Sequence, residues 1–482
     1  MGKNKDKIRV SFKNSNAAED VTGSCTVITY GNPQKTILVD CGLTQGGQSL
    51  LKEYQANSRK FSFKEKEVDY IIITHLHGDH SLLLPRLYKK GCKAPIIFPK
   101  GSFDIFKEMA LDSAKIMGRN SEDLERKLKK NYPPIYDEED VKKTLEYVKE
   151  YNIGEKIEID DTLTIEFVPS GHIISACQVV LYIKNGNSTK KIAFTGDLGN
   201  IDVNRMYTNE FKPIQNANLL VGESTYANKE RSSKSKDRDK DLEKIKSAVY
   251  TTCIDNKSKI LIPSFALMRT QTIATIIYDL FNNNEDFNIP VYIASPLACK
   301  ISKLFEKLLE GEDLDKWNKV KNWDKLNFID NFDKIEEIVN NSEPCIFIAS
   351  AGMMNAGYSV YIAEKLLPGY NNTILFVGYS VEGTLSWKIK QKKTKTVTIN
   401  GKSIPSRCRV INLSSFSSHM GRDSLIKYYS GGMGTGFYGK IALQHGNFKD
   451  KVEFGKELQS EIEKRNRTDK VIIVNKSTEI TL

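Results

Sequence analysis

The run Thr74-His75-Leu76-His77-Gly78-Asp79-His80 decides how the rest of the chain is interpreted. It follows Val68–Ile73, an apolar segment typical of a buried strand, and precedes a helix expected over Ser81–Tyr88. The chain of 482 residues contains only six histidines, and three of them stand in this run. Imidazole and carboxylate are ligands of catalytic metal ions, and loops at strand ends hold them well. The first two histidines can face one ion while the aspartate and the third histidine face another, so we predict a two-metal site.

The remaining three histidines also stand in loop-like settings, in Ser170-Gly171-His172, Ser417-Ser418-His419 and Gln444-His445-Gly446. Taken singly, each is as consistent with a packed or surface histidine as with a ligand. Together with the first run they leave no histidine unassigned. Asp197 and Glu223 likewise close apolar strands, where a carboxylate is costly unless it is paired or bound to a metal.

Composition narrows the class of protein and its environment. A chain of this length exceeds what one hydrophobic core usually serves, so we expect two domains or one domain with a large insertion. The 71 Lys and Arg residues outnumber 60 Asp and Glu residues, and the net charge of +11 suits a polyanionic partner. Basic clusters stand at residues 126–130, 229–240 and 388–395, but such a cluster is more often a solvated face than a binding site.

Cysteine usage and hydropathy predict a location. Eight cysteines occur without a C-x-x-C pair, which is typical of reduced thiols in a cytoplasmic protein. The first 14 residues are polar, and no apolar run has the length of a membrane helix. We therefore expect a cytoplasmic protein without a membrane partner.

The pattern of strands and helices predicts three segments. In residues 1–222 short apolar strands end in polar loops, with helical cover expected over Ala110–Lys130 and Glu138–Tyr151. Residues 223–407 alternate longer helices with four apolar strands, as in a parallel α/β sheet. Residues 408–482 return to strand, loop, helix and strand, with His419 and His445 each just past a strand-like run. We interpret the middle segment as an insertion within the first domain.

The order of these motifs resembles the β-CASP nucleases, which are metallo-β-lactamase-fold enzymes with an inserted cap. The resemblance rests on His75-x-His77-x-Asp79-His80, followed by His172, Asp197, Glu223, His419 and His445, and covers nearly the whole chain. Segments 262–266, 349–354 and 378–385 resemble recurrent segments of the cap, and the last favours the branch of the cleavage and polyadenylation endonuclease over RNase J. The implied fold is an α/β metallo-β-lactamase αββα sandwich with an inserted β-CASP α/β cap domain.

The resemblance also implies roles for individual residues. One Zn²⁺ would be held by His75, His77 and His172, a second by Asp79, His80 and His445, and Asp197 would bridge them, although mixed ligands of this kind admit Mn²⁺ as well. Asp40 resembles an acidic motif that steadies the histidine loop, with a plain strand-end aspartate as the alternative. The implied catalytic residues are Asp79, Glu223 and His419, the last as a proton donor oriented by a carboxylate.

This chain departs from the family pattern at several positions. Many relatives have a histidine soon after the motif ending in Tyr226, where this chain reads Ala227-Asn228. Met420 and Gly421 replace a small residue and an aspartate, which puts the orientation of His419 in question. About 37 residues follow His445, so we expect no additional C-terminal domain of the kind that bacterial RNase J carries.

The resulting hypothesis is a two-metal ribonuclease acting on single-stranded RNA, endonucleolytic with a 5′-to-3′ exonuclease activity left open. A histidine at position 445 resembles RNA-acting members, whereas DNA-repair members tend to have valine. Substrate contacts are expected at Ser264, Arg269 and Ser350, although an arginine opening a helix is also typical of a surface ion pair. The alternatives are a DNA nuclease of the same fold, a small-molecule metallo-hydrolase and a catalytically inactive RNA-binding scaffold. A homodimer and an RNA-processing or degradation complex are left open as partners.

Overall fold

The computed structural model describes residues 7–46, 49–186, 188–203, 206–228, 235–378, 380–392 and 395–482. Parts of the basic clusters at 229–240 and 388–395, and Tyr379 of one cap segment, lie outside these ranges. The chain divides into two compact units: residues 1–45, 50–232 and 418–482 form the first, and residues 46–49 and 233–417 form the second.

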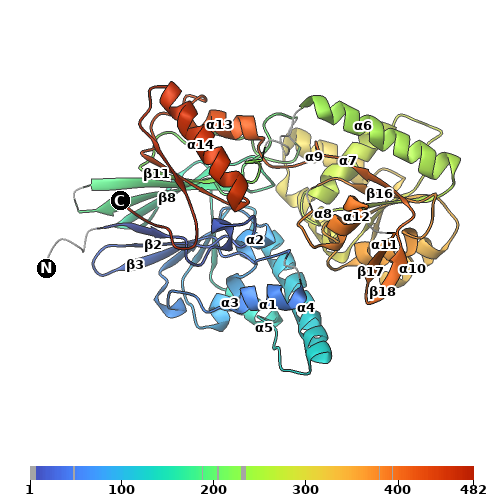
Figure 1. Ribbon diagram of the computed structural model, residues 1–482, viewed down its shortest axis with the longest axis horizontal. Coiled ribbons are helices and arrows are strands. Elements are labelled where there is room, and N and C mark those ends of the chain that lie inside the picture. Colours follow the sequence, from blue (N-terminus) through green and yellow to red (C-terminus); the bar gives the residue numbers. More distant parts are fainter. Residues whose placement is uncertain are drawn as a thin grey trace. The chain divides into compact units, whose positions relative to one another are not determined.

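The first unit contains two seven-stranded sheets, which Figure 1 shows at the blue and green end of the colour scale and in the red C-terminal part. The first sheet has the order β22 (Glu479–Thr481), β1 (Arg9–Ser11), β2 (Thr26–Tyr30), β3 (Lys35–Val39), β4 (Tyr70–Ile72), β5 (Ile96–Pro99) and β6 (Val148–Tyr151). The second has the order β21 (Lys470–Ile473), β20 (Lys440–Gln444), β11 (Leu219–Glu223), β10 (Ser188–Phe194), β9 (Cys177–Asn185), β8 (Leu163–Pro169) and β7 (Lys156–Asp160).

The two sheets pack face to face through a shared apolar core. Ile28, Ile37 and Ile72 of the first sheet are buried in one cluster with Phe167 and Val179 of the second. Burial of alternate side chains on each strand removes apolar area from water, which is the main force that holds such layers together.

Helices cover the outer faces of both sheets and complete an αββα sandwich (Figure 1). Phe106 contacts Phe98 of β5 across the first outer face, and Tyr429 and Leu458 join the core on the outer face of the second sheet. The helices of this unit are α1 (Leu50–Ser58), α2 (Gly78–Ser81), α3 (Leu84–Lys89), α4 (Phe103–Leu128), α5 (Glu138–Leu145), α13 (Arg422–Tyr429) and α14 (Phe448–Lys464), with short 3-10 turns η1 (Asn16–Ala18) and η2 (Glu65–Glu67).

The predictions of two helices in this unit were partly wrong. The segment Glu138–Tyr151 is helical only to Leu145, because Val148–Tyr151 pairs with β5 as a parallel edge strand. The expected helix over Ser81–Tyr88 is split into α2 and α3, with Pro85 in the first turn of α3. Proline is accepted at such a position because the amide it lacks has no partner inside the helix.

The second unit is built on a six-stranded sheet in which every pair is parallel. Its order is β14 (Leu326–Ile329), β13 (Val291–Ala294), β15 (Cys345–Ala349), β12 (Lys259–Pro263), β16 (Thr373–Phe376) and β19 (Arg409–Asn412). A hairpin of β17 (Thr396–Ile399) and β18 (Lys402–Pro405) accompanies it. The helices are α6 (Ser235–Val249), the π-helix η4 (Tyr250–Asp255), α7 (Arg269–Phe281), α8 (Pro296–Leu308), α9 (Gly311–Lys321), α10 (Phe332–Asn340), α11 (Tyr358–Leu366) and α12 (Leu385–Gln391). This α/β unit is the expected inserted cap.

The sequence predicted segment boundaries after residues 222 and 407. The compact units divide after residues 232 and 417, ten residues later in each case. Strand β19, which the sequence analysis placed in the completing segment, pairs with β16 of the six-stranded sheet. None of the helices in the described ranges combines the length and the apolar character needed to span a bilayer.

Candidate metal centre

The predicted ligands meet at one edge of the sandwich because the strands that carry them run in the same direction. Strands β10, β11 and β20 are parallel neighbours in the second sheet, and β3 and β4 are parallel neighbours in the first. Parallel strands present their carboxyl ends at the same edge, and the loops that follow them lie side by side. These loops carry Asp40, the run 75–80, Asp197 and His445, and Glu223 is the last residue of β11.

Four of the predicted residues form what we call the first ligand group: His75, His77, His172 and Asp197. The Nδ1 atom of His77 lies 3.2 Å from Nε2 of His75 and 3.1 Å from Nε2 of His172. Oδ2 of Asp197 lies 3.5 Å from His75 Nε2 and 3.6 Å from His172 Nε2. One atom of each residue therefore faces a common point, as ligands of a single ion do.

The second ligand group consists of Asp79, His80 and His445. The Nε2 atoms of His80 and His445 are 3.1 Å apart, and Oδ2 of Asp79 lies 3.3 Å from Nε2 of His445. Oδ1 of Asp197 is 3.4 Å from Nε2 of His80, so Asp197 contacts both groups through different oxygens. The pairing of β11 with β20 brings His445 to residues more than 360 positions earlier in the chain.

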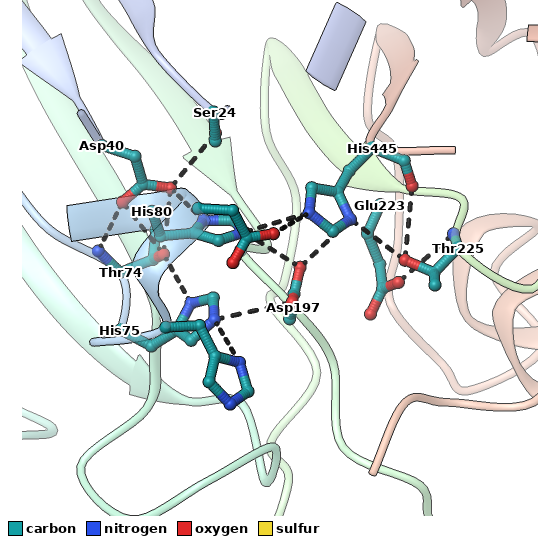
Figure 2. Close-up of polar contacts among 12 residues, drawn as sticks. Ser24, Asp40, Thr74, His75, His80, Asp197, Glu223, Thr225 and His445 are labelled. Atoms are coloured by element: carbon teal, nitrogen blue, oxygen red, sulfur yellow. Dashed lines mark hydrogen bonds and ion pairs between the residues drawn. The ribbon is translucent and has the colours of Figure 1, made fainter. Parts of the chain in front are cut away.

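Four of these imidazoles place Nδ1 within hydrogen-bond distance of an oxygen that is not part of the ligand groups. Nδ1 of His80 lies 2.7 Å from Asp40, and Nδ1 of His172 lies 3.2 Å from the carbonyl oxygen of Ser418. Nδ1 of His75 and of His445 lie 3.1 and 3.0 Å from the hydroxyls of Thr74 and Thr225. In the neutral ring the Nε2 atom then carries a lone pair, so several lone pairs converge with carboxylate oxygens. Figure 2 shows the rings of His75, His80 and His445 around Asp197.

The donor set fits a bound cation. Oδ1 of Asp197 is buried and accepts no hydrogen bond from the residues that the structure describes. A buried carboxylate oxygen without a donor is expensive, and lone pairs only about 3 Å apart repel one another unless a positive charge lies among them. Imidazole nitrogen with carboxylate oxygen is the chemistry that zinc accepts and that manganese tolerates.

Protonation states within the site follow from burial and neighbouring charge. Burial, and next the neighbouring His75, lowers the pKa of His77 to about 3, so its ring is neutral at physiological pH. Burial alone would raise the pKa of Asp79, but the hydrogen bond with His445 and the charge of His80 lower it to about 2. Neutral histidine and ionised aspartate are the forms that bind metal.

Asp40 and Gly42 hold the histidine run in place. Asp40 accepts hydrogen bonds from the amide and hydroxyl of Thr74, at 2.9 and 3.0 Å, as well as from His80. Its φ of 62° is unusual for a residue with a side chain and is maintained by these bonds. A Cβ on Gly42 would lie 1.7 Å from the carbonyl oxygen of Asp79, so only glycine allows this close approach.

Glu223 and His419 form a pair beside the ligand groups. Nδ1 of His419 lies 3.3 Å from Oε2 of Glu223, and its Nε2 lies 3.9 Å from Oδ2 of Asp197. The side chain of His419 is 20% exposed, whereas those of Glu223 and Asp197 are 1% and 2% exposed, so His419 borders solvent at the rim of the site. Burial alone would lower the pKa of His419, but Glu223 and Asp197 raise it to about 9.

Backbone contacts orient His419 despite the departure at the next two positions. Residue 419 forms an isolated bridge with Gly199, and the amide of Met420 donates to the carbonyl of Leu198 at 2.8 Å. Met420 is fully buried in the apolar core beneath α13, and Gly421 caps that helix. The amide of Leu198 also donates to Oε1 of Glu223 at 2.5 Å, so a single loop contacts both members of the pair.

The expected substrate contacts lie in the second unit. Ser264 follows β12 and Ser350 follows the neighbouring strand β15, and the amide of Ser264 donates to the carbonyl of Ala349 at 2.9 Å. Arg269 is the first residue of α7 and is half-buried. The hydroxyl of Ser350 is buried and has no hydrogen-bond partner among the described residues. The two serines therefore adjoin at the carboxyl edge of the parallel sheet.

Two site residues were missed by the sequence analysis. The hydroxyls of Thr74 and Thr225 accept the Nδ1 protons of His75 and His445. Both threonines stand inside motifs that were recognised, directly before His75 and two positions after Glu223. A hydroxyl within one or two positions of a ligand or acidic motif is the signal that would have found them.

Family models and known proteins give the same assignment as the fold. Residues 18–242 match the metallo-beta-lactamase superfamily and residues 270–389 match the Beta-Casp domain. The sandwich and its metal centre therefore define a member of the metallo-β-lactamase superfamily. Because the inserted unit carries the second match, the chain belongs to the β-CASP family within it.

Curated relatives align with most of the chain. Ribonuclease TTHA0252 of Thermus thermophilus is 26% identical over 92% of this chain and 94% of its own length. Transcription termination factor FttA of Methanocaldococcus jannaschii is 27% identical over 87% of this chain, and Endoribonuclease ysh1 of Schizosaccharomyces pombe is 28% identical over 85%. The matches span 64% and 51% of the last two relatives. A crystal structure of a protein of unknown function from Enterococcus faecalis shares the fold, with a TM-score of 0.51 at 12% identity over 99% of this chain and 100% of that one.

Proposed function

We propose that this protein is a metal-dependent ribonuclease that hydrolyses RNA phosphodiester bonds. The observation that carries the proposal is the convergence of His and Asp ligand atoms beside the pair of Glu223 and His419. Relatives named as a ribonuclease and an endoribonuclease support RNA as the substrate class. We propose endonucleolytic cutting of single-stranded RNA, with 5′-to-3′ exonuclease activity as a second mode of the same site.

The two ligand groups would hold two Zn²⁺ ions, with Mn²⁺ as the alternative. His75, His77 and His172 would bind one ion, Asp79, His80 and His445 the other, and Asp197 would bind both. Bound ions of this kind lower the pKa of water and neutralise negative charge on the phosphate. The chain itself contributes a rigid arrangement, because Asp40, Thr74 and the Ser418 carbonyl fix three of the rings before substrate arrives.

His419 would donate a proton to the departing 3′-oxygen. Glu223 accepts the Nδ1 proton, which leaves a proton on Nε2 of the charged ring, the nitrogen nearer to the ligand groups. A pKa of about 9 keeps the ring charged at physiological pH, and the exposure of its side chain allows contact with a substrate. The products would be a 5′-phosphate and a 3′-hydroxyl.

The decisive experiment compares end-labelled single-stranded RNA with DNA of the same sequence. Wild-type protein should cut the RNA, and the double variant Asp79→Ala, His80→Ala should not. Cutting of DNA instead would favour the DNA nuclease. If the double variant cuts RNA as well as the wild type does, the ribonuclease proposal is wrong.

Two other rivals predict different outcomes of the same assay. A small-molecule metallo-hydrolase would leave both nucleic acids intact but hydrolyse a thioester or lactone in a metal-dependent way. An inactive scaffold would bind RNA, leave it intact and bind no metal. The convergence of seven ligand residues argues against the scaffold, since such a protein has no use for a complete ligand set.

Location and assembly belong to the proposal as well. We propose a cytoplasmic location, which is supported by eight buried cysteines, all as free thiols. A homodimer and membership of an RNA-processing or degradation complex are further proposals. Light scattering on the purified protein tests the homodimer, and affinity purification from the native host tests the complex.

A further inference from the structure

Thr225 joins the end of β11 to the loop that carries His445. Its hydroxyl lies 3.0 Å from Nδ1 of the His445 ring and donates to the His445 carbonyl oxygen at 3.3 Å (Figure 2). His445 has a φ of 54°, a conformation that a residue with a side chain seldom adopts without support. One hydroxyl therefore contacts both the ring and the backbone of the same residue.

The His445 ring has a choice of acceptor for its Nδ1 proton. Besides the Thr225 hydroxyl at 3.0 Å, Oδ1 of Asp197 lies 3.4 Å from the same nitrogen. The threonine proton is already directed to the His445 carbonyl, so its oxygen is left as an acceptor. While the Nδ1 proton points to Thr225, Oδ1 of Asp197 stays without a hydrogen bond, as it is in the structure.

We infer that Thr225 is a positioning residue that accepts the Nδ1 proton of His445 and keeps Asp197 available to the second ligand group. This inference rests on the proposed function only in that the second ligand group binds a metal ion. Thr225 acts through His445 and touches no reacting atom. Without its hydroxyl, the ring would shift so that Nδ1–H donates to Oδ1 of Asp197, and that carboxylate oxygen would be lost to a hydrogen bond.

The two ligand groups should respond differently to the loss of the Thr225 hydroxyl. In the first group, Nδ1 of His75 contacts Thr74 and Nδ1 of His172 contacts the carbonyl of Ser418, so these two rings are oriented by residues other than Thr225. Loss of the Thr225 hydroxyl should therefore weaken the second group while leaving the first intact. Removal of a partner that orients a ligand typically weakens metal binding by about 10–100-fold.

The test titrates metal-free wild type, Thr225→Val and Thr225→Ser with Zn²⁺ alone against a chelating indicator, and counts bound ions by elemental analysis. Valine keeps the shape and removes the hydroxyl, whereas serine keeps the hydroxyl. We expect two sites in the wild type, and in T225V one unchanged site and one about 10–100-fold weaker. T225S should restore the second site to within a few fold.

Ser224→Ala is the matched control. The Ser224 hydroxyl donates to the carbonyl of Gln444 at 2.7 Å, at the same strand junction, but does not contact the His445 ring. S224A should keep both sites. If T225V fails to fold, Thr225→Ala removes the same hydroxyl with a smaller side chain and takes its place.

Two results would overturn the inference: both sites unchanged in T225V, or equal weakening in T225V, T225S and S224A, which would indicate general damage to the junction. Because this titration contains no RNA, it is independent of the cleavage assay. A wild type that leaves RNA intact would refute the proposed ribonuclease while the metal titration still decides the role of Thr225.

Discussion

Nδ1 of His80 lies 2.7 Å from Oδ2 of Asp40, and this bond links the second ligand group to the backbone of the first sheet. Asp40 also accepts two hydrogen bonds from Thr74, the residue that precedes His75. A single carboxylate thus supports rings from both ligand groups. If Asp40 steadies the histidine loop, it does so through its hydrogen bonds with His80 and Thr74.

We predict that Asp40→Asn weakens metal binding by about 10–100-fold. The asparagine amide has nearly the same shape as the carboxylate. Its NH2 group, however, donates hydrogen bonds and would face donors that now point at a carboxylate oxygen. Metal titration of the purified variant measures the effect. Asp69→Asn is a suitable control, because Asp69 accepts a bond from the amide of Thr36 in the same sheet and contacts no ligand. Equal affinities in D40N and the wild type would contradict the prediction.

Metal removal should abolish cleavage and lower stability together. An ion that binds only the folded state stabilises it by about 2.7 kcal/mol at a concentration 100 times the dissociation constant. Dialysis against a chelator should therefore lower Tm and stop RNA cleavage, and added Zn²⁺ or Mn²⁺ should restore both. The Asp79→Ala, His80→Ala variant should show a smaller shift of Tm on adding metal. A chelated protein that still cuts RNA would argue against a metal-dependent enzyme.

The pair of Glu223 and His419 predicts a shift in pH dependence. His419 must hold a proton to donate it, so activity should fall as the pH rises through its pKa, which is about 9. Burial lowers this pKa and Glu223 raises it, so Glu223→Gln should leave burial dominant and move the alkaline limb of kcat to lower pH. A pH profile of kcat for the two proteins measures this. An alkaline limb that stays in place in E223Q would remove His419 from the role of acid.

Much of this site could be predicted because its ligands are rare residue types at strand ends. His75, His77, Asp79 and His80 lie within six positions, so local sequence was enough to group them. Placing His445 with them depends on β11 pairing in parallel with β20, which no local pattern encodes. The resemblance to a family supplied that step, and the parallel pairing of these strands is its physical cause.

The parts that sequence did not predict depend on tertiary neighbours. Val148–Tyr151 carries a helix-like spacing of apolar residues, yet it forms an edge strand because β5 offers its unpaired backbone. The Thr225 hydroxyl is one of many in the chain, and only the left-handed backbone at His445 brings a ring nitrogen to it. Orphaned atoms such as Oδ1 of Asp197 are likewise visible only in three dimensions.

Gly42→Ala should damage the metal centre, whereas Gly118→Ala should not. The added methyl at position 42 would collide with the carbonyl of Asp79, whereas a methyl at position 118 of α4 would meet nothing within 4 Å. Overpacking costs about 1–3 kcal/mol, and alanine stabilises a helix interior by about 1 kcal/mol relative to glycine. Chemical denaturation should therefore give shifts of opposite sign, and metal titration should show weaker binding only in G42A. Similar stabilities and affinities in the two variants would contradict the close packing at Gly42.

Ser350 offers a test of the expected substrate contacts in which stability and substrate affinity move in opposite directions. Its hydroxyl is buried without a partner, and such a group typically costs about 1–3 kcal/mol. If the hydroxyl serves the RNA, Ser350→Ala should raise Tm of the free protein and also raise KM, with metal content unchanged.

Ser359→Ala is the matched control, because that hydroxyl donates to the carbonyl of Ala351 at 2.8 Å and is satisfied within the second unit. S359A should lower Tm and leave KM unchanged. A rise in Tm of S350A without any change in KM would mean that the orphaned hydroxyl has no substrate partner. The contact would then have to be sought at Ser264 or Arg269, where the same comparison of KM with kcat applies.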